Sequence, residues 1–318
     1  MLRRATSSAL FPAALYMSCV VAQMASAHPG SGITVDNDGQ VYFFHTAYGM
    51  WTIDTEGALS QFDGPGWHWM ALDPTGAFAD QRWPRVLEHM RPGAIEYGDA
   101  ELKSVGPSQT IVCATSFPIA IGPKGALYYA EPSKDERLHI KRLEPGAKPT
   151  LHATIPVVNE IAPNNKPGKA LWIHGITVGP DGTVYYTEKE AIQKIDPDGT
   201  VSIIANNIAI PNCEGHDRGG VMLRGVAVTE DGTLYVASTA CGAILKIRPG
   251  GPVEFALLRT EADESWSATG VAVHGDDVYV LEFWYAEMDR PETWMPRVRK
   301  LLPDGSVKVL ATVTELPK

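Results

Sequence analysis

The chain has 318 residues, 44% of them hydrophobic and 20% charged, so it can form a core and carries too little charge for a disordered protein. Lysine and arginine number 27 against 37 aspartates and glutamates, which gives a formal net charge of −10. Because no basic patch stands out, the sequence disfavours nucleic acid and anionic membrane surfaces as partners.

The first 27 residues have the pattern of an export signal. Arg3 and Arg4 form a basic start, an apolar stretch follows over 9–22, and Ala25-Ser26-Ala27 is a small-residue cleavage site. The stretch is too short and wrongly flanked for a membrane anchor, and no later segment is apolar for long enough to span a bilayer. We therefore expect a monomer, periplasmic or secreted, with one mature domain over 28–318.

One hairpin pattern repeats along the mature chain. Its clear copies are GITVDNDGQVYFF from Gly32, GITVGPDGTVYYTE from Gly175, GVAVTEDGTLYVAS from Gly225 and GVAVHGDDVYVLE from Gly270, with weaker copies from Trp69 and Pro118. Each is a β-branched or aromatic run, a turn and a second run, and most copies precede another hairpin such as IQKIDPDGTVSIIA. Six four-stranded units of roughly 48 residues predict an all-β fold, a six-bladed β-propeller with antiparallel blades.

The repeated phrase also resembles a known family. G-[IV]-x-V-x-x-D-G-x-[VL]-Y followed by [IV]-x-K-[IL]-x-P-x-G looks like the NHL repeat. Proteins built this way, or on similar six-bladed rings, include peptidyl-hydroxyglycine lyases, streptogramin lyases, gluconolactonases and binding scaffolds. The resemblance is specific for architecture, whereas function has to be argued from the site.

Propeller geometry predicts which residues converge at one mouth of the central channel. The residue before each first strand and the residue that ends each second strand should both lie there. We call these sets the inner row and the second row. The inner row is Ser31, His68, Phe117, His174, Arg224 and Thr269; the second row is His45, Arg82 (or Asp80), Glu131, Glu188, Ser238 and Glu282.

Two histidines of the inner row suggest a metal. The peptidyl-hydroxyglycine lyases, which this chain resembles, place zinc-binding histidines directly before the first strand of separate blades, in a His-Gly-hydrophobic context. His174 matches that context and His68 matches by position. His28, which begins the chain if the signal is cut after Ala27, is the candidate third ligand. The predicted cofactor is a divalent metal, zinc first and calcium second. A channel in which the polar residues bind one another or water is the alternative.

Other residues at the mouth suggest substrate chemistry. Arg224 is a candidate clamp for a carboxylate, with a salt bridge to a neighbouring acid as the alternative. Glu188 or Glu282 would act as general base or oxygen ligand, or else belong to a channel hydrogen-bond network. The longer loop of blade six contains three aromatic residues that are candidates for a substrate wall or for packing on the blade: Trp284, Tyr285 and Trp294.

Removal of the signal would leave Cys113, Cys213 and Cys241. We predict a disulfide between Cys213 and Cys241, which both fall at the mouth, and a buried thiol at Cys113, in the outer strand of blade two.

Two functions remain open from the sequence. The first is a metal-dependent lyase or hydrolase acting on a small organic molecule at the channel mouth. The second is a propeller without catalysis that binds a peptide, a glycan or a partner protein on the same face.

Overall fold

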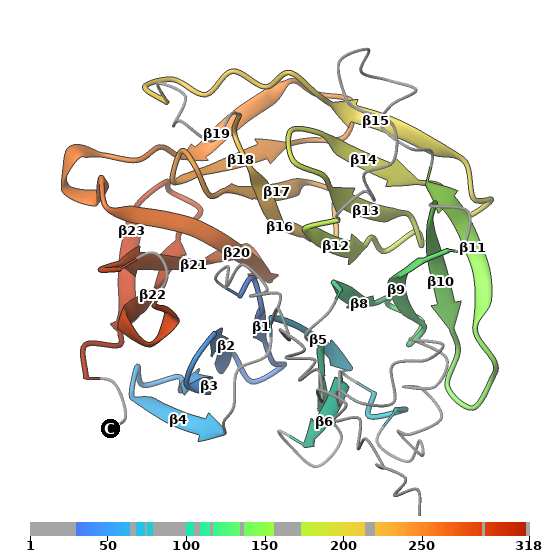
Figure 1. Ribbon diagram of the computed structural model, residues 1–318, viewed down its shortest axis with the longest axis horizontal. Helices are drawn as coiled ribbons and strands as arrows, with labels where there is room; N and C mark the ends of the chain where they lie inside the picture. The colour runs from blue at the N-terminus through green and yellow to red at the C-terminus, as the bar shows by residue number, and fades with distance from the viewer. Residues whose placement is uncertain are drawn as a thin grey trace, which may run out of the picture.

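The computed structural model describes residues 30–63, 68–73, 75–78, 100–104, 109–114, 117–133, 137–155, 173–213, 220–287 and 290–315. The expected signal segment and His28 lie outside these ranges. Six antiparallel sheets are arranged as the blades of a ring (Figure 1), which confirms the predicted six-bladed β-propeller. The described residues contain no α-helix, and therefore no helix long and apolar enough to cross a bilayer.

Blade one follows the predicted order. Its strands are β1 (Ile33–Val35), β2 (Val41–His45), β3 (Gly49–Ile53) and β4 (Leu59–Asp63).

Blade two departs from the expected pair of hairpins. Its described strands are β5 (Trp69–Asp73), β6 (Ala100–Ser104) and β7 (Thr110–Ala114), in the order β5-β7-β6. The segment that follows β5 in the chain was expected to form a hairpin with β5. Instead, β7 is the strand that pairs with β5. Asp73 accepts hydrogen bonds from the Thr75 and Phe78 amides, and this turn puts the Phe78 ring in the core, fully buried.

Cys113 consequently lies in β7, next to the inner strand, and the expectation that it belongs to the outer strand of blade two is wrong. Its thiol is fully buried among Phe44, Met50 and Met70, between blades one and two.

Blades three to six keep the repeated order of four consecutive strands. Blade three has β8 (Ile119–Ile121), β9 (Leu127–Pro132), β10 (Leu138–Leu143) and β11 (Thr150–Ile155). Blade four has β12 (Gly175–Val178), β13 (Val184–Thr187), β14 (Ile192–Ile195) and β15 (Val201–Ala205). Blade five has β16 (Leu223–Val228), β17 (Leu234–Ser238), β18 (Ala243–Ile247) and β19 (Val253–Leu257).

Blade six has β20 (Trp266–His274), β21 (Asp277–Tyr285), β22 (Trp294–Leu301) and β23 (Val307–Thr312). Two 3-10 turns flank its inner hairpin, η2 (Glu261–Asp263) and η3 (Pro291–Thr293). The blade is complete without a strand from blade one.

The glycine that begins the repeated phrase is explained by the packing of neighbouring inner strands. A Cβ atom on Gly175 would overlap the carbonyl oxygen of Arg224, and one on Gly270 would lie 2.5 Å from the carbonyl oxygen of Ser31. Since real Cβ atoms do not approach backbone oxygens so closely, only glycine fits there. These contacts bring the start of each inner strand to a common axis.

Candidate functional site at the channel mouth

Two inner-row residues, Thr269 and Arg224, lie at irregularities of their inner strands. In β20 the register shifts between Ala268 and Gly270, so Thr269 is an extra residue opposite β21. In β16 the shift falls between Leu223 and Val226 and includes Arg224. A β-bulge bends its strand and changes the direction in which the extra side chain points. These bulges account for polar side chains at the entrance of otherwise apolar strands.

His68 and His174 directly precede the inner strands of blades two and four, and a hydrogen bond joins these two blades. The indole Nε1 of Trp69 donates to the carbonyl oxygen of His174 at 3.1 Å. The Trp69 ring also packs edge-on against the His68 ring, with centroids 5.5 Å apart. The sequence offered no means of finding this role of Trp69, because its partner is 105 residues away.

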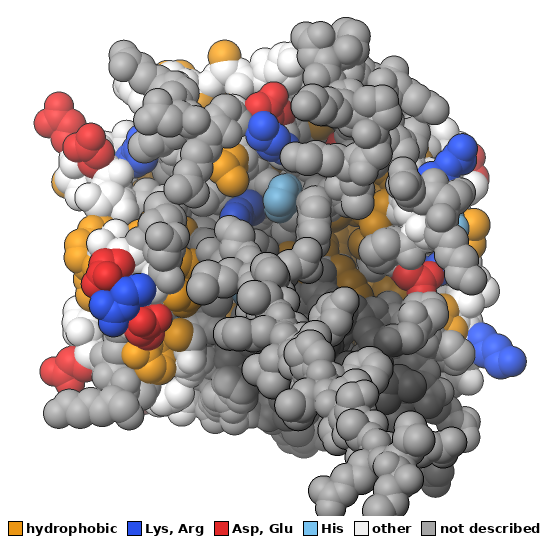
Figure 2. Space-filling view, in the orientation of Figure 1, with side chains coloured by type: hydrophobic (Ala, Val, Ile, Leu, Met, Phe, Trp, Pro, Cys, Tyr) orange, Lys and Arg blue, Asp and Glu red, His pale blue; other side chains and the backbone are white. Residues whose placement is uncertain are grey.

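Arg224 places a positive charge beside His174. Burial and this charge lower the pKa of His174 to about 4, so the imidazole is neutral at physiological pH. Arg224 itself is only 7% exposed, and burial lowers its pKa, although a guanidinium stays protonated. Figure 2 shows a histidine and a basic side chain near the centre of this face.

Arg224 is held by its neighbours on two sides. Its carbonyl oxygen accepts a hydrogen bond from the Thr187 hydroxyl of blade four. Its guanidinium interacts electrostatically with Tyr285 of blade six, and burial raises the pKa of this phenol. The structure therefore brings Arg224, His174 and Tyr285 together at one mouth.

Glu188 follows the last residue of β13, at the same end of blade four. Its side chain is buried, and burial raises its pKa to about 7, with an opposing contribution from the Gln193 amide. Gln193 is fixed in turn by the Tyr186 hydroxyl at 3.0 Å. Within the described part of the chain, Glu188 Oε1 has no hydrogen-bond partner. A carboxyl group with a pKa near neutrality can both take up and release a proton at physiological pH.

Glu282, in blade six, is the other predicted acid, and both of its oxygens take part in an ion network. Its two oxygens accept from Arg297 Nε at 2.6 Å and from Arg299, and both arginines also contact Asp263 of η2. The Arg297 guanidinium lies over the Trp266 ring, 4.1 Å from its centroid. This buried network binds β22 to β21 and η2, and it occupies both oxygens of Glu282.

The aromatic residues of blade six divide between core and mouth. Trp294 is fully buried in the core shared by blades one and six, and its indole donates to the carbonyl oxygen of Glu287 at 2.8 Å. Tyr285 packs edge-on against it, with ring centroids 5.1 Å apart, and reaches Arg224. Trp284 is half-buried at the end of β21.

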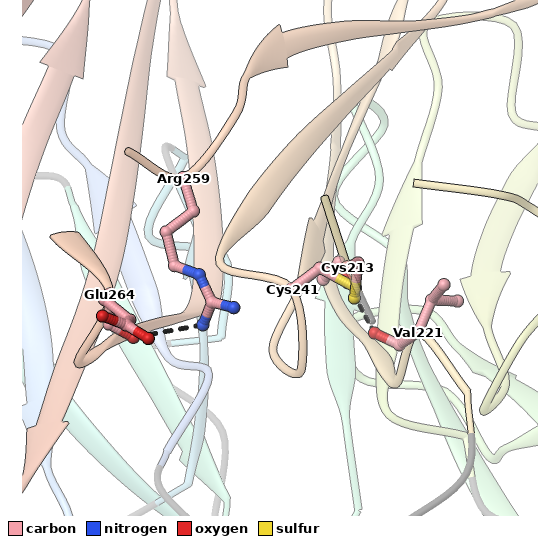
Figure 3. Close-up of a disulfide and its surroundings, with 6 residues drawn as sticks. Cys213, Val221, Cys241, Arg259 and Glu264 are labelled. Atoms are coloured by element: carbon pink, nitrogen blue, oxygen red, sulfur yellow. Dashed lines mark hydrogen bonds between the residues drawn. A yellow bond between two sulfur atoms is a disulfide. The ribbon is translucent and has the colours of Figure 1, made fainter. Parts of the chain in front are cut away.

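Cys213 and Cys241, the predicted pair, are joined by a disulfide, with Cα atoms 5.3 Å apart (Figure 3). The bond ties the segment that enters blade five to the turn between β17 and β18. Close to it, the Ser238 hydroxyl bonds the carbonyl oxygen of Val221, and Arg259 donates to the carbonyl oxygen of Glu264 at 3.2 Å.

The remaining described residues of the inner and second rows that follow make contacts within the fold. Glu131 forms an ion pair with Lys141 at 3.3 Å, Phe117 is buried in the core, and His45 is hydrogen-bonded at the boundary between blades one and six. Arg82, Asp80 and His28 lie outside the described residues.

The residues at the mouth do not by themselves fit a resident metal. Across the described ranges, no group of three or more His, Cys, Asp and Glu side chains could hold an ion. In addition, the guanidinium that acts on His174 would repel a divalent cation. His174 and His68 supply two imidazoles, whereas a zinc site with an open position needs three protein ligands.

Comparison with protein-family models found no match, and no curated protein matches the chain. Solved structures are similar at low identity. One is an auxiliary nutrient binding protein from Bacteroides thetaiotaomicron, with a TM-score of 0.54, 13% identity, and coverage of 89% of this chain and 69% of that one. Another is a streptogramin B lyase, with a TM-score of 0.49, 15% identity, and coverage of 91% and 86%. Regucalcin from Agrobacterium tumefaciens has a TM-score of 0.47, 13% identity, and coverage of 79% and 81%. At 13% identity, the likeness to the nutrient binding protein concerns the fold alone.

Proposed function

We propose that the chain is an exported lyase or hydrolase that acts on a small organic acid at the channel mouth. The observation that carries the proposal is Glu188, a buried carboxyl with a pKa of about 7 and one oxygen that lacks a hydrogen-bond partner among the described residues. A structural carboxylate would normally be satisfied, so this group is available for a proton transfer.

In the proposed reaction, Arg224 holds the carboxylate of the substrate. A guanidinium can bind a carboxylate through two parallel hydrogen bonds, and burial strengthens this interaction. In its ionised form, Glu188 removes a proton from the substrate or from an attacking water, and then returns it to the leaving group. His174, neutral beside Arg224, supplies a hydrogen bond without adding positive charge. Export rests on the basic, apolar and small-residue segments of 1–27.

A zinc or calcium ion bound by His174, His68 and His28 remains a prediction, and no step above depends on it. Metal analysis of the purified protein checks it: a stoichiometric ion that His174→Ala removes would support the site. A protein that stays free of metal after zinc and calcium are added would contradict it.

The experiment that tests the function is a screen of carboxylate-bearing lactones, esters and hydroxyglycine peptides. We expect Glu188→Gln to lower kcat by about 10²-fold or more, because the amide cannot accept the proton. Arg224→Lys should mainly raise KM, since it keeps the charge and loses the planar fork. The rate of the unmodified enzyme should rise with pH through about 7, as Glu188 ionises.

Exposed Glu56→Gln is the matched control and should leave the rate unchanged. If Glu188→Gln retains the rate, the assigned base is wrong. If no compound of the screen is turned over, the alternative of a binding propeller without catalysis is preferred.

A further inference from the structure

A second candidate site lies away from the channel mouth, between blades three and four. A groove of about 430 Å³ is lined by residues of the β8–β9, β12–β13 and β14–β15 turns and by residues of β9, β10, β11 and β12. These turns lie at the opposite ends of the strands from the inner and second rows, so the groove opens on the other face of the ring. Its volume falls in the range of small-molecule sites.

The two walls of the groove carry opposite charges. Blade three contributes Lys124, Arg142 and His152, and blade four contributes Asp181 and Asp198. Among the described residues, no ion pair joins the two walls. Arg142 instead pairs with Glu144 of its own blade, and its Nε donates to the Tyr128 hydroxyl at 3.0 Å.

The acids of the blade-four wall are fixed by their own turns. Asp181 accepts from the Thr183 amide and the Thr183 hydroxyl, both at 2.9 Å, and Asp198 accepts from the Thr200 amide at 2.9 Å. These hydrogen bonds lower the pKa of both carboxyl groups, so both are ionised at physiological pH. The negative wall is therefore preorganised.

The blade-three wall contains a polar atom that lacks a partner. His152 Nε2 is buried and, within the described ranges, makes no hydrogen bond, while its ring packs edge-on against Tyr128 with centroids 5.3 Å apart. A buried ring nitrogen without a partner is costly, and the His152 side chain belongs to the wall of the groove. Lys124, on the same wall, is exposed and forms no ion pair with a described residue.

We propose that this groove binds a small zwitterion of the size of an amino acid or dipeptide. Its carboxylate would bind Lys124, Arg142 and His152, and its ammonium group would bind Asp181 and Asp198. An anion alone would face the two aspartates, and a cation alone would face Lys124 and Arg142, so a molecule with both charges fits the two walls best. The site is separate from the proposed catalytic mouth.

Isothermal titration of the full mature chain tests the proposal. The probes are the standard amino acids and the dipeptides Gly-Gly, Gly-Leu and Leu-Gly at millimolar concentration, followed by the N-acetyl and amide forms of any probe that binds. We expect at least one zwitterion to bind and each blocked form to bind about tenfold more weakly, because each block removes one charge pair.

Two conservative variants remove one charge from each wall. Lys124→Gln changes an exposed side chain, and Asp198→Asn keeps an oxygen that can accept from the Thr200 amide, so both should fold. Each should weaken binding about tenfold. Exposed Lys308→Gln, on β23, and Glu188→Gln, at the mouth, should leave it unchanged. The proposal is overturned if no probe binds, if the blocked forms bind equally well, or if Lys124→Gln and Asp198→Asn have no effect.

Discussion

Burial, more than any neighbouring charge, sets the chemistry of Glu188. Among the described residues, no arginine or lysine contributes to its pKa, which burial raises from the ordinary value of 4.5 to about 7. Glu282 occupies the equivalent position in blade six, yet it binds two arginines. The same residue type at equivalent places in the repeat thus has two different environments, and of the two only Glu188 has an oxygen without a hydrogen-bond partner among the described residues.

The raised pKa of Glu188 has a consequence for stability. Between pH 4.5 and about 7 the folded chain binds more protons at this site than the unfolded chain, so the contribution of Glu188 to the free energy of unfolding falls as pH rises. Glu188→Gln removes this dependence. We expect the variant to equal the unmodified chain near pH 4.5 and to be more stable by up to about 3 kcal/mol above pH 7.

Denaturant unfolding at a series of pH values measures this difference, with Glu56→Gln as the control. A difference between Glu188→Gln and the unmodified chain that does not change with pH would show that Glu188 has an ordinary pKa.

At the scale of secondary-structure elements, the disulfide is a covalent link between the segment that enters blade five and the β17–β18 turn. Cys213 and Cys241 are 28 positions apart, and closing a loop of that length stabilises a fold by about 3 kcal/mol through the unfolded state. We expect Cys213→Ser, Cys241→Ser and the double variant to lose the same stability, because each of them breaks the same bond.

Thermal unfolding with and without a reductant checks this prediction. Reductant should lower the Tm of the unmodified chain and leave the double variant unchanged. A double variant that loses clearly more than either single variant would show that the cysteines contribute separately.

The elements that the sequence predicts best are those in which the repeat is regular. The blades that begin at Gly175, Gly225 and Gly270 follow the phrase closely, and their strands lie where the hairpins were expected. Blade two was predicted less well, because Asp73 turns the chain so that Phe78 enters the core instead of a second strand.

The sequence predicts which polar residues reach the mouth but not which of them bind one another. Counting from each turn glycine places Glu188 and Glu282 in the second row. The partners of Glu282 are on β22 and those of Glu188 on β14, and no local pattern identifies them. These pairs depend on packing between strands, so only the folded chain reveals them.

At the scale of the whole molecule, the ring is completed by side chains where blade six meets blade one. His45 of β2 hydrogen-bonds the carbonyl oxygen of Trp294 through Nε2 at 2.6 Å, while its Nδ1 accepts from the amide of Ala47 at 3.0 Å. On the same boundary, the Thr269 hydroxyl donates to the carbonyl oxygen of Gly30 at 3.0 Å. Since Nδ1 accepts, the His45 ring must be neutral.

Burial lowers the pKa of His45 to about 4, which makes this boundary sensitive to acid. Between pH 6.5 and 4 the unfolded chain binds more protons at His45 than the folded chain, so its contribution to stability is present above pH 6.5 and is lost as pH falls. We expect His45→Phe to reduce the free energy of unfolding by about 2 kcal/mol at pH 7, because the polar groups it leaves behind are buried.

The loss caused by His45→Phe should shrink as pH falls below 6.5 and disappear before pH 4, because the unmodified chain loses the contribution of His45 over this range. Unfolding curves at pH 7, 5.5 and 4 measure it, with His274→Gln, at the end of β20, as the control. A loss of equal size at all three pH values would contradict the neutral, buried histidine.

The boundary between blades one and six differs from the other five in one respect: among the residues that the structure describes, no strand and no connecting loop crosses it. Each blade is a contiguous stretch of chain, and its inner strand packs against the next one around the whole ring, β20 against β1 included. The architecture is therefore cyclic, although the polypeptide is linear. If the two ends of the ring were linked and the chain were opened between two other blades, every sheet would remain whole. A circular permutant could therefore begin with any of the blades. In such a permutant a covalent link would join blade six to blade one, next to the hydrogen bonds of His45 and Thr269 that join these two blades in the present chain.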